Sequence, residues 1–199
     1  DNDLMFISEN RARLGKFFTF VLADAKLIET LVDKARFQML AKTHDLPVPE
    51  SGTFNARNDS ISDLNLDFPF IIKPVMRGLE AEKLQDHAKA LEVESSAKLE
   101  RLWPELERMG FDFLAQRLIP GPESAIESYH AYFDETGEVV AGFTGKKIRT
   151  LPPRYGHSTA LETTSAADVE DLGRDIAGRI GLTGIAKFDF KRAPDGTLH

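Results

Sequence analysis

Three stretches of the chain repeat apolar residues at the three- and four-residue spacing of an amphipathic helix. The first spans residues 25–42. The second follows Ser95 or Ser96, either of which can cap a helix, and it contains Pro104, which is expected to kink or split it. The third ends near Gly181. The apolar positions are Ile28, Leu31, Val32, Ala35 and Met39 in the first; Leu99, Leu102, Leu106 and Met109 in the second; Val169, Leu172, Ile176 and Ile180 in the third. The pattern therefore predicts three helices.

Other stretches are continuously apolar or alternate with a period of two, which is typical of strands. They are Phe68–Pro74, Phe111–Leu118, Glu127–Phe133, Glu138–Thr144 and Gly184–Arg192. The residues Asp134–Gly137 and Ala193–Gly196 carry turn signals, so each is expected to connect two strands of a hairpin. Strands mixed with helices, with hairpins late in the chain, predict an α+β fold of helices packed on sheets.

Composition narrows the classes of function. Of the 199 residues, 42% are apolar and 29% are charged, which is typical of a globular protein. The formal charge of −7 argues against a nucleic-acid partner, which would need a basic face. The absence of cysteine excludes disulfides, a thiolate nucleophile and a cysteine zinc site. The longest apolar run, Phe17–Ala23, is too short for a membrane span, and the first residues lack a signal-peptide pattern. We therefore expect a soluble, cytoplasmic protein without a membrane partner.

Lysines in this acidic chain stand at positions suited to anions. Lys73 precedes a proline, which favours an extended backbone and fixes the direction of its ammonium group, as a phosphate site requires. A solvated lysine at a strand end is the commoner explanation of this dipeptide alone. Lys187, Asp189 and Lys191 share one strand face, where the carboxylate can hold Mg²⁺ between lysines that neutralise phosphates. The same face can equally be a salt-bridged, exposed edge.

Two further segments are candidates for ligand binding. Lys147 and Arg149 stand two residues apart, so they lie on one side if the strand continues. The segment from Gln116 to Glu123 leaves a strand through a Pro-Gly turn, and its exposed backbone groups can pair with a purine edge. Glu123 can then accept hydrogen bonds from two sugar hydroxyls. A plain strand-to-turn connection is the alternative.

The order of these motifs resembles the ATP-grasp family of ATP-dependent ligases. The resemblance runs from about Asp33 to His199 and is nearest to the carboxylate–amine-ligase-like and carbamoyl-phosphate-synthase-like members. It is carried by Asp33-Lys34, Pro47-Val48-Pro49, Ile71-Ile72-Lys73-Pro74, Gln116 with Ile119-Pro120-Gly121 and Glu123, Lys147-Ile148-Arg149, Pro152-Pro153, Lys187-Phe188-Asp189-Phe190 and Asp195-Gly196. It implies two α+β subdomains that clasp MgATP.

The resemblance also implies roles for single residues. Lys34 and Lys73 would contact the phosphates of the nucleotide. Gln116 would bind the adenine amino group, the backbone N–H of Ile119 would bind the ring, and Glu123 would take the ribose hydroxyls. The implied nucleotide-binding set is Lys34, Lys73, Gln116, Arg117, Ile119 and Glu123.

The remaining implied residues concern metal and chemistry. Asp189 would be the first Mg²⁺ ligand and Lys187 would lie beside the reacting phosphate. Lys147 or Arg149 would face the γ-phosphate or the carboxylate of the substrate. The resemblance departs after Lys73-Pro74, where the family usually has a flap rich in glycine and serine and Val75–Glu80 contains a single glycine.

The implied organisation has three parts. Residues 1–32 would be the tail of a preceding α/β domain, 33–115 the N-terminal subdomain and 116–199 the C-terminal subdomain. The last part is expected to be incomplete, because the second metal ligands of the family follow the Asp195-Gly196 turn by more than the three residues present here.

Three functions compete on this evidence. The preferred one is an ATP-dependent ligase of the carboxylate–amine or carboxylate–thiol type that works through an acylphosphate on small-molecule substrates. It is expected to be present here as an ATP-binding fragment that is itself inactive. The others are a nucleotide-binding module without catalysis and a protein-interaction domain. A homodimer is compatible with each of them.

Overall fold

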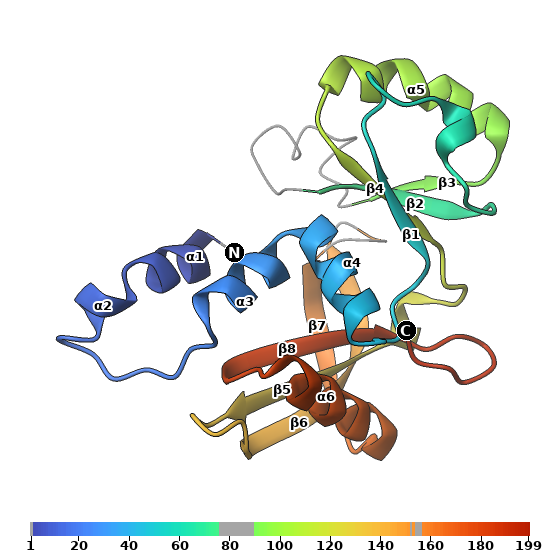
Figure 1. Ribbon diagram of the computed structural model, residues 1–199. Helices are drawn as coiled ribbons and strands as arrows, with labels where there is room; N and C mark the ends of the chain where they lie inside the picture. Colours follow the sequence, from blue (N-terminus) through green and yellow to red (C-terminus); the bar gives the residue numbers. More distant parts are fainter. Residues whose placement is uncertain (1, 76–89, 152, 154–156) are drawn as a thin grey trace.

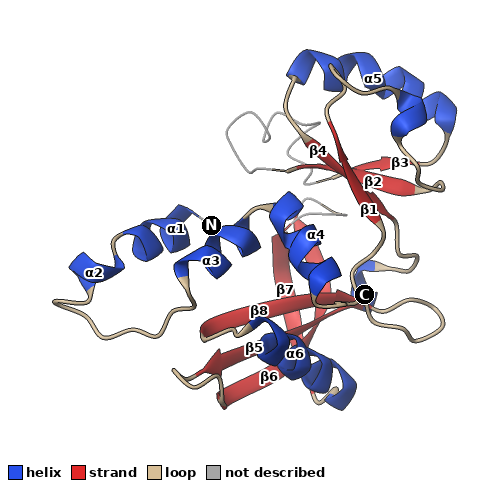
Figure 2. Cartoon of the chain, viewed as in Figure 1, coloured by secondary structure: helices blue, strands red, loops and turns tan. Residues whose placement is uncertain are grey.

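In the part of the chain that the structure describes, the strands form two sheets, each with one long helix beside it (Figure 2). The computed structural model describes residues 2–75, 90–151, 153 and 157–199. The first sheet has the order β1-β4-β2-β3, and the second has the order β7-β6-β5-β8. All strand pairs among these described residues are antiparallel, so the α+β prediction is confirmed. The strands are β1 (Ser51–Phe54), β2 (Phe70–Pro74), β3 (Leu91–Val93), β4 (Phe113–Arg117), β5 (Ile126–Phe133), β6 (Val139–Leu151), β7 (His157–Thr164) and β8 (Gly184–Lys191).

Helices begin the chain and flank the sheets (Figure 1). The helices are α1 (Asn2–Glu9), α2 (Arg11–Leu14), α3 (Ala25–Val32), α4 (Lys34–Thr43), α5 (Ser96–Met109) and α6 (Ala167–Ile180), with short 3₁₀ turns η1 (Ile61–Asp63) and η3 (Glu123–Ala125). In the view of Figure 1, α4 lies below the first sheet and above strand β8. No helix of the described part combines the length and apolar character needed to cross a bilayer.

Each sheet has its own hydrophobic core. In the first, Phe70, Ile72, Phe113 and Ala115 alternate along β2 and β4 and pack against Leu99 of α5. The opposite face of these two strands therefore carries the intervening residues. The members of the second core come from the segment 23–48, the second sheet, α6 and the connection from α6 to β8. Its buried residues are Ala23, Ile28, Ala41, Leu46, Tyr129, Ala131, Phe133, Val169, Ile176, Ala177, Leu182 and Phe190.

The helix predicted over 25–42 is wrong as a single element. Asp33 has an extended backbone (ψ 116°), and its side chain accepts hydrogen bonds from the N–H groups of Ala35 and Arg36 at 2.8 and 3.0 Å. An aspartate in this position caps a new helix instead of continuing the old one. The break also resets the helical phase, so Met39 is 65% exposed while Ala41 is fully buried.

The structure also corrects the prediction for Pro104 and the predicted end of one strand. Helix α5 is not split at Pro104, because the helix runs without a break from its cap at Ser95 and buries Leu99 and Leu106. Strand β6 continues seven residues beyond the predicted end, as far as Leu151, with register shifts on both sides of Arg149. The turn after β8 is confirmed, because Lys191 and His199 exchange two backbone hydrogen bonds of 2.9 and 3.1 Å.

Candidate functional site

The first group of predicted residues gathers on the face of the first sheet that is opposite α5. Lys73 Nζ donates to Gln116 Oε1 at 2.9 Å, across strands β2 and β4. Lys34, the first residue of α4, donates from Nζ to the carbonyl oxygen of Val75 at 2.9 Å. This bond connects a helix of the second core to the end of strand β2. The structure therefore brings together three predicted nucleotide contacts, Lys34, Lys73 and Gln116.

The ammonium group of Lys73 is in an unfavourable environment. Burial, and to a smaller extent the positive charge of Lys34, lower the pKa of Lys73 from 10.5 to about 8. A buried charge is stabilised by a counter-charge or neutralised by proton loss. Its hydrogen-bond acceptor, Gln116 Oε1, is neutral, so an anion placed here would stabilise the charged state of Lys73.

A second group lies on the face of the second sheet that is opposite its core. Asp189 Oδ1 lies 3.1 Å from Lys187 Nζ and 3.7 Å from Lys147 Nζ. The two lysines come from β8 and β6, which are the neighbours of β5 on either side. One carboxylate thus pairs with two ammonium groups and offsets part of their charge. The structure therefore brings together the predicted residues Lys147, Lys187 and Asp189.

His130 and Ser128 belong to this second group, although no predicted site includes them. In the β5–β8 register, His130 is opposite Lys187 and Ser128 is opposite Asp189. His130 Nε2 lies 3.1 Å from Ser128 Oγ, and the imidazole ring stacks on Phe143 at 4.6 Å. Burial, and then the charge of Lys187, lower the pKa of His130. Residue spacing finds no metal or triad pattern for this histidine, but its alternation with the buried Tyr129 and Ala131 would place it on the polar face.

The segment from Gln116 to Glu123 connects the two groups. Ile119 is buried, and within the described residues its backbone N–H donates no hydrogen bond. Glu123 Oε1 accepts a hydrogen bond from Thr150 Oγ1 of β6. Lys191 Nζ donates to the carbonyl oxygens of Gly121 and Pro122 at 2.8 and 2.5 Å. The segment therefore begins beside Lys73 and ends against the second sheet.

Two predicted residues lie outside these groups. Arg117 is exposed and has the strand parity of Phe113 and Ala115, opposite to that of Gln116. Arg149 is exposed and donates from Nε to Thr159 Oγ1 at 3.1 Å. The expectation that it shares one side with Lys147 fails, because a register shift between the two residues interrupts the alternation of the strand.

The oxygen donors of the second group suit a magnesium ion bound together with phosphates. Mg²⁺ is commonly held by one or two carboxylates plus phosphate oxygens, and Asp189 supplies such a carboxylate. Among the described residues, no group of three or more histidine or acidic side chains forms a complete metal site. The segment after Val75, where the sequence departs from the flap usual in the family, lies outside the described residues.

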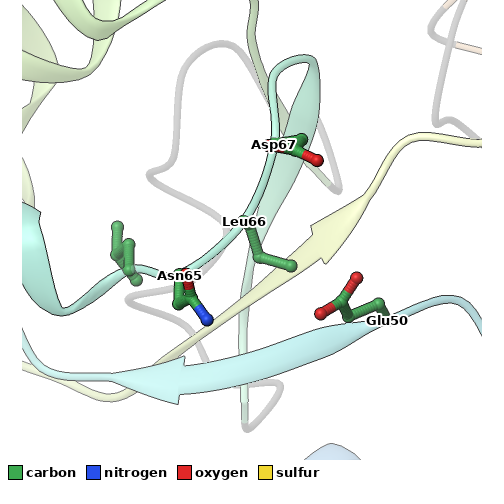
Figure 3. A pocket seen from close by; sticks show the side chains of 5 residues that line it. Glu50, Asn65, Leu66 and Asp67 are labelled. Carbon is green, nitrogen blue, oxygen red and sulfur yellow. The ribbon is translucent and has the colours of Figure 1, made fainter.

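A pocket of about 310 Å³ lies elsewhere, at the start of β1 (Figure 3). Asn65 and Leu66 lie opposite Glu50 in this view, and Asp67 and Leu64 complete the lining. Two carboxylates line it and none of the predicted residues does, so it does not suit a polyphosphate.

Comparison with curated proteins shows a similarity to a ligase. A D-aspartate ligase of Enterococcus faecium (strain Aus0004) is 24% identical over 200 residues, which cover 94% of this chain and 47% of that protein. The chain thus spans about half the length of the curated relative it matches. No protein-family model matches the chain.

Solved structures of ligases and of a synthetase share the fold. An L-amino acid ligase from Bacillus licheniformis superposes with a TM-score of 0.69 at 15% identity, over 98% of this chain and 44% of that one. The ADP complex of an N5-carboxyaminoimidazole ribonucleotide synthetase gives 0.66 at 13% identity, over 88% and 45%. The VanG D-Ala:D-Ser ligase from Enterococcus faecalis gives 0.65 at 18% identity, over 94% and 55%. At these identities the likeness establishes the fold.

Proposed function

We propose that this chain, which has the ATP-grasp fold that its motifs predicted, binds MgATP as part of an ATP-dependent carboxylate–amine ligase. The observation that carries the proposal is the segment from Gln116 to Glu123. It begins in contact with one lysine group and ends against the sheet that bears the other. A nucleotide laid along this segment would have cationic side chains on both sides of its phosphates.

The adenosine half of the nucleotide is assigned to the segment itself. The Ile119 N–H is available to a ring nitrogen, as an extended backbone pairs with another strand. Gln116 Oε1 accepts from Lys73 and has a second lone pair for the adenine amino group. Glu123 uses Oε1 for Thr150, which leaves Oε2 to accept from the ribose hydroxyls. The buried base and the sugar would thus be recognised by three groups within eight residues of chain.

The phosphate half is assigned to the lysines. Lys34 and Lys73 would neutralise one side of the polyphosphate, and Lys147 and Lys187 the other. Asp189 would hold Mg²⁺ with one oxygen while phosphate oxygens complete its coordination. The bound metal would supply charge neutralisation at the β- and γ-phosphates.

The proposed reaction has two steps. An oxygen of the substrate carboxylate attacks the γ-phosphorus, the bond to the bridging oxygen breaks, and ADP leaves. An amine then attacks the acyl carbon of the acylphosphate, phosphate leaves, and the amine loses a proton. Lys187 beside the transferred phosphate and Lys147 across Asp189 would stabilise the charge that develops, because such transfers depend on positioning and electrostatics. Arg149, exposed at Thr159, would meet the carboxylate substrate.

The subdomain division at 33 and 116 is part of the same proposal. Lys34 connects the two proposed subdomains. Helix α4 packs in the second core, while Lys34 at its start donates a hydrogen bond to Val75, which directly follows β2 of the first sheet. Closure of the two sheets on a nucleotide would act on this bond.

Isothermal titration calorimetry with MgATP tests the nucleotide assignment. We expect binding by the chain and a loss of about tenfold or more in affinity for Lys73→Met, since a hydrogen bond to a charged group contributes about 1.5–3 kcal/mol. Lys98→Met is the matched control, because Lys98 lies on α5 and pairs with Glu94 at 3.7 Å. Equal affinities for the two variants would overturn the assignment.

Ligase chemistry is tested by trapping the acylphosphate. A longer protein that carries this chain and continues past His199 is incubated with MgATP, hydroxylamine and single amino acids, because the chain alone is expected to be an inactive fragment; D-aspartate is included because the curated relative is a D-aspartate ligase. We expect ADP and a hydroxamate with at least one of them. ATP binding without either product would favour a nucleotide-binding module, and absence of binding would favour an interaction domain.

A further inference from the structure

Lys191 is the third charged residue of the β8 face that bears Lys187 and Asp189, but its ammonium group has a different use. Lys191 Nζ donates hydrogen bonds to the carbonyl oxygens of Gly121 at 2.8 Å and Pro122 at 2.5 Å. Two consecutive carbonyls of the connecting segment thus bind one lysine from the end of β8. An ammonium group held in this way is less available to a phosphate than that of Lys187.

The backbone at Gly121, which carries the first of these carbonyls, has an unusual conformation. Gly121 has φ +121°, a conformation that residues with a side chain rarely adopt. A Cβ at this position would lie at ordinary contact distances, 3.6 Å from Ala125 Cβ and 3.8 Å from Lys191 Cε. The requirement for glycine here therefore comes from the backbone angle and not from lack of space.

The two bonded carbonyls directly precede Glu123. The Glu123 carboxylate accepts from Thr150 Oγ1 on one side and attracts the charge of Lys191 on the other. Burial is the main cause that lowers the pKa of Lys191, and the charge of Lys147 acts in the same direction. The hydrogen bonds to Gly121 and Pro122 compensate the desolvation of the Lys191 ammonium group and hold it against the segment that carries Glu123.

We infer that Lys191 is a positioning residue for nucleotide sugar selection. By binding the carbonyls of Gly121 and Pro122, it fixes Glu123 so that the free carboxylate oxygen meets the 2′- and 3′-hydroxyls of a ribose. The inference rests on the proposed ATP site, and it adds a residue whose effect is confined to the sugar. Lys191 itself does not touch the nucleotide.

The experiment compares ATP with 2′-deoxy-ATP by calorimetry, both with Mg²⁺. We expect the chain to bind ATP about tenfold more tightly, because the 2′-hydroxyl donates to a charged acceptor. In Lys191→Met this ratio falls to about one while the affinity for 2′-deoxy-ATP changes less than twofold. Lys146→Met serves as the matched control and keeps the tenfold ratio, because Lys146 is an exposed lysine of β6, which β5 separates from β8 in the same sheet.

A second variant alters the backbone whose carbonyl oxygens accept the hydrogen bonds of Lys191. Gly121→Ala leaves Lys191 intact but strains the φ of +121°, and we expect the same loss of the ATP to 2′-deoxy-ATP ratio. Heteronuclear NOE values of the Gly121 and Glu123 amides, measured without nucleotide, should fall in both variants. This measurement tests whether the hydrogen bonds of Lys191 to Gly121 and Pro122 order the segment, whether or not a variant binds ATP.

The outcomes separate the two claims. A chain that binds neither nucleotide refutes the proposed function and the sugar site with it. A chain that binds both nucleotides equally keeps its nucleotide site and overturns the sugar-selection inference. A Lys191→Met variant that keeps the tenfold ratio, or that leaves the amide NOE values unchanged, overturns the role of Lys191 alone.

Discussion

The two lysine groups of this chain differ in how their charge is balanced. On the first sheet, the hydrogen-bond acceptor of Lys73 is the neutral amide of Gln116, and the nearby charge of Lys34 is of the same sign. On the second sheet, Asp189 lies between Lys147 and Lys187 and offsets part of their charge. Lys73 therefore has a neutral acceptor, whereas the second group contains a carboxylate of its own.

This difference assigns distinct roles to the two groups in binding a metal–nucleotide complex. A phosphate at Lys73 gains from the buried ammonium group without displacing a carboxylate of the described residues from it. A phosphate at Lys187 or Lys147 competes with Asp189, unless a divalent cation occupies that carboxylate. We therefore expect the metal dependence of nucleotide binding to arise on the second sheet, while the first sheet contributes affinity with or without metal.

The largest expected effect is a rise in stability with pH that is caused by Lys73. The pKa of Lys73 is about 8 in the folded chain, against 10.5 for a solvated lysine such as that of the unfolded chain. Between these values the unfolded chain holds a proton that the folded chain has lost, so raising the pH favours folding. The contribution is at most about 3 kcal/mol, fully developed near pH 10.5 and absent below about pH 8.

Urea denaturation of the chain and of Lys73→Met at a series of pH values measures this contribution. The difference in unfolding free energy between the two proteins should be constant below pH 8 and should change in favour of the lysine protein above it. Lys98→Met should follow the parent chain throughout. A difference that is flat from pH 7 to 10.5 would show that Lys73 is as well solvated as an ordinary lysine, and the contrast between the two groups would disappear.

The sequence predicts the faces of the strand residues best where apolar and polar residues alternate regularly. Regular alternation along β8 predicts which side chains share a face, and Lys187 lies beside Asp189 as expected. The prediction fails where a single residue changes the geometry. Asp33 caps a new helix, and the register shift beside Arg149 interrupts the parity of β6.

Other features depend on contacts between distant segments, which local spacing does not contain. The bond from Lys34 to Val75 joins residues 41 positions apart, and that from Lys191 to Gly121 joins residues 70 positions apart. Lys191 has the same spacing as Lys187 relative to Asp189, so the sequence alone gives both lysines one role. Only the path of the connecting segment distinguishes them.

A change of intermediate size is expected from Asp189→Asn. Without the carboxylate, affinity for MgATP should fall about tenfold, because one metal ligand is lost. Affinity for metal-free ATP should rise two- to threefold, because Lys147 and Lys187 no longer share a counter-ion. The stability change should stay below about 1 kcal/mol, as these ion pairs are partly exposed.

Calorimetry in the presence of Mg²⁺ and of a chelator separates these effects. Lys73→Met provides the contrast, since it should weaken both forms of ATP by a similar factor. A loss of similar size for both forms in Asp189→Asn would place the metal dependence elsewhere and remove the basis for treating the groups as different.

The smallest effect is expected from Arg149→Ala, which tests whether the second group ends at Lys147. Arg149 is exposed and bonded to Thr159, whereas Lys147 is mostly buried and paired with Asp189. We expect MgATP affinity to change less than twofold in Arg149→Ala and about fivefold or more in Lys147→Ala, since only the second removes a charge from the group around Asp189. Calorimetry of the two variants under identical salt decides the matter. Equal losses of affinity in Arg149→Ala and Lys147→Ala would contradict this expectation. The strand would then have to rearrange on binding so that Arg149 contacts the phosphates, and the second group would include Arg149.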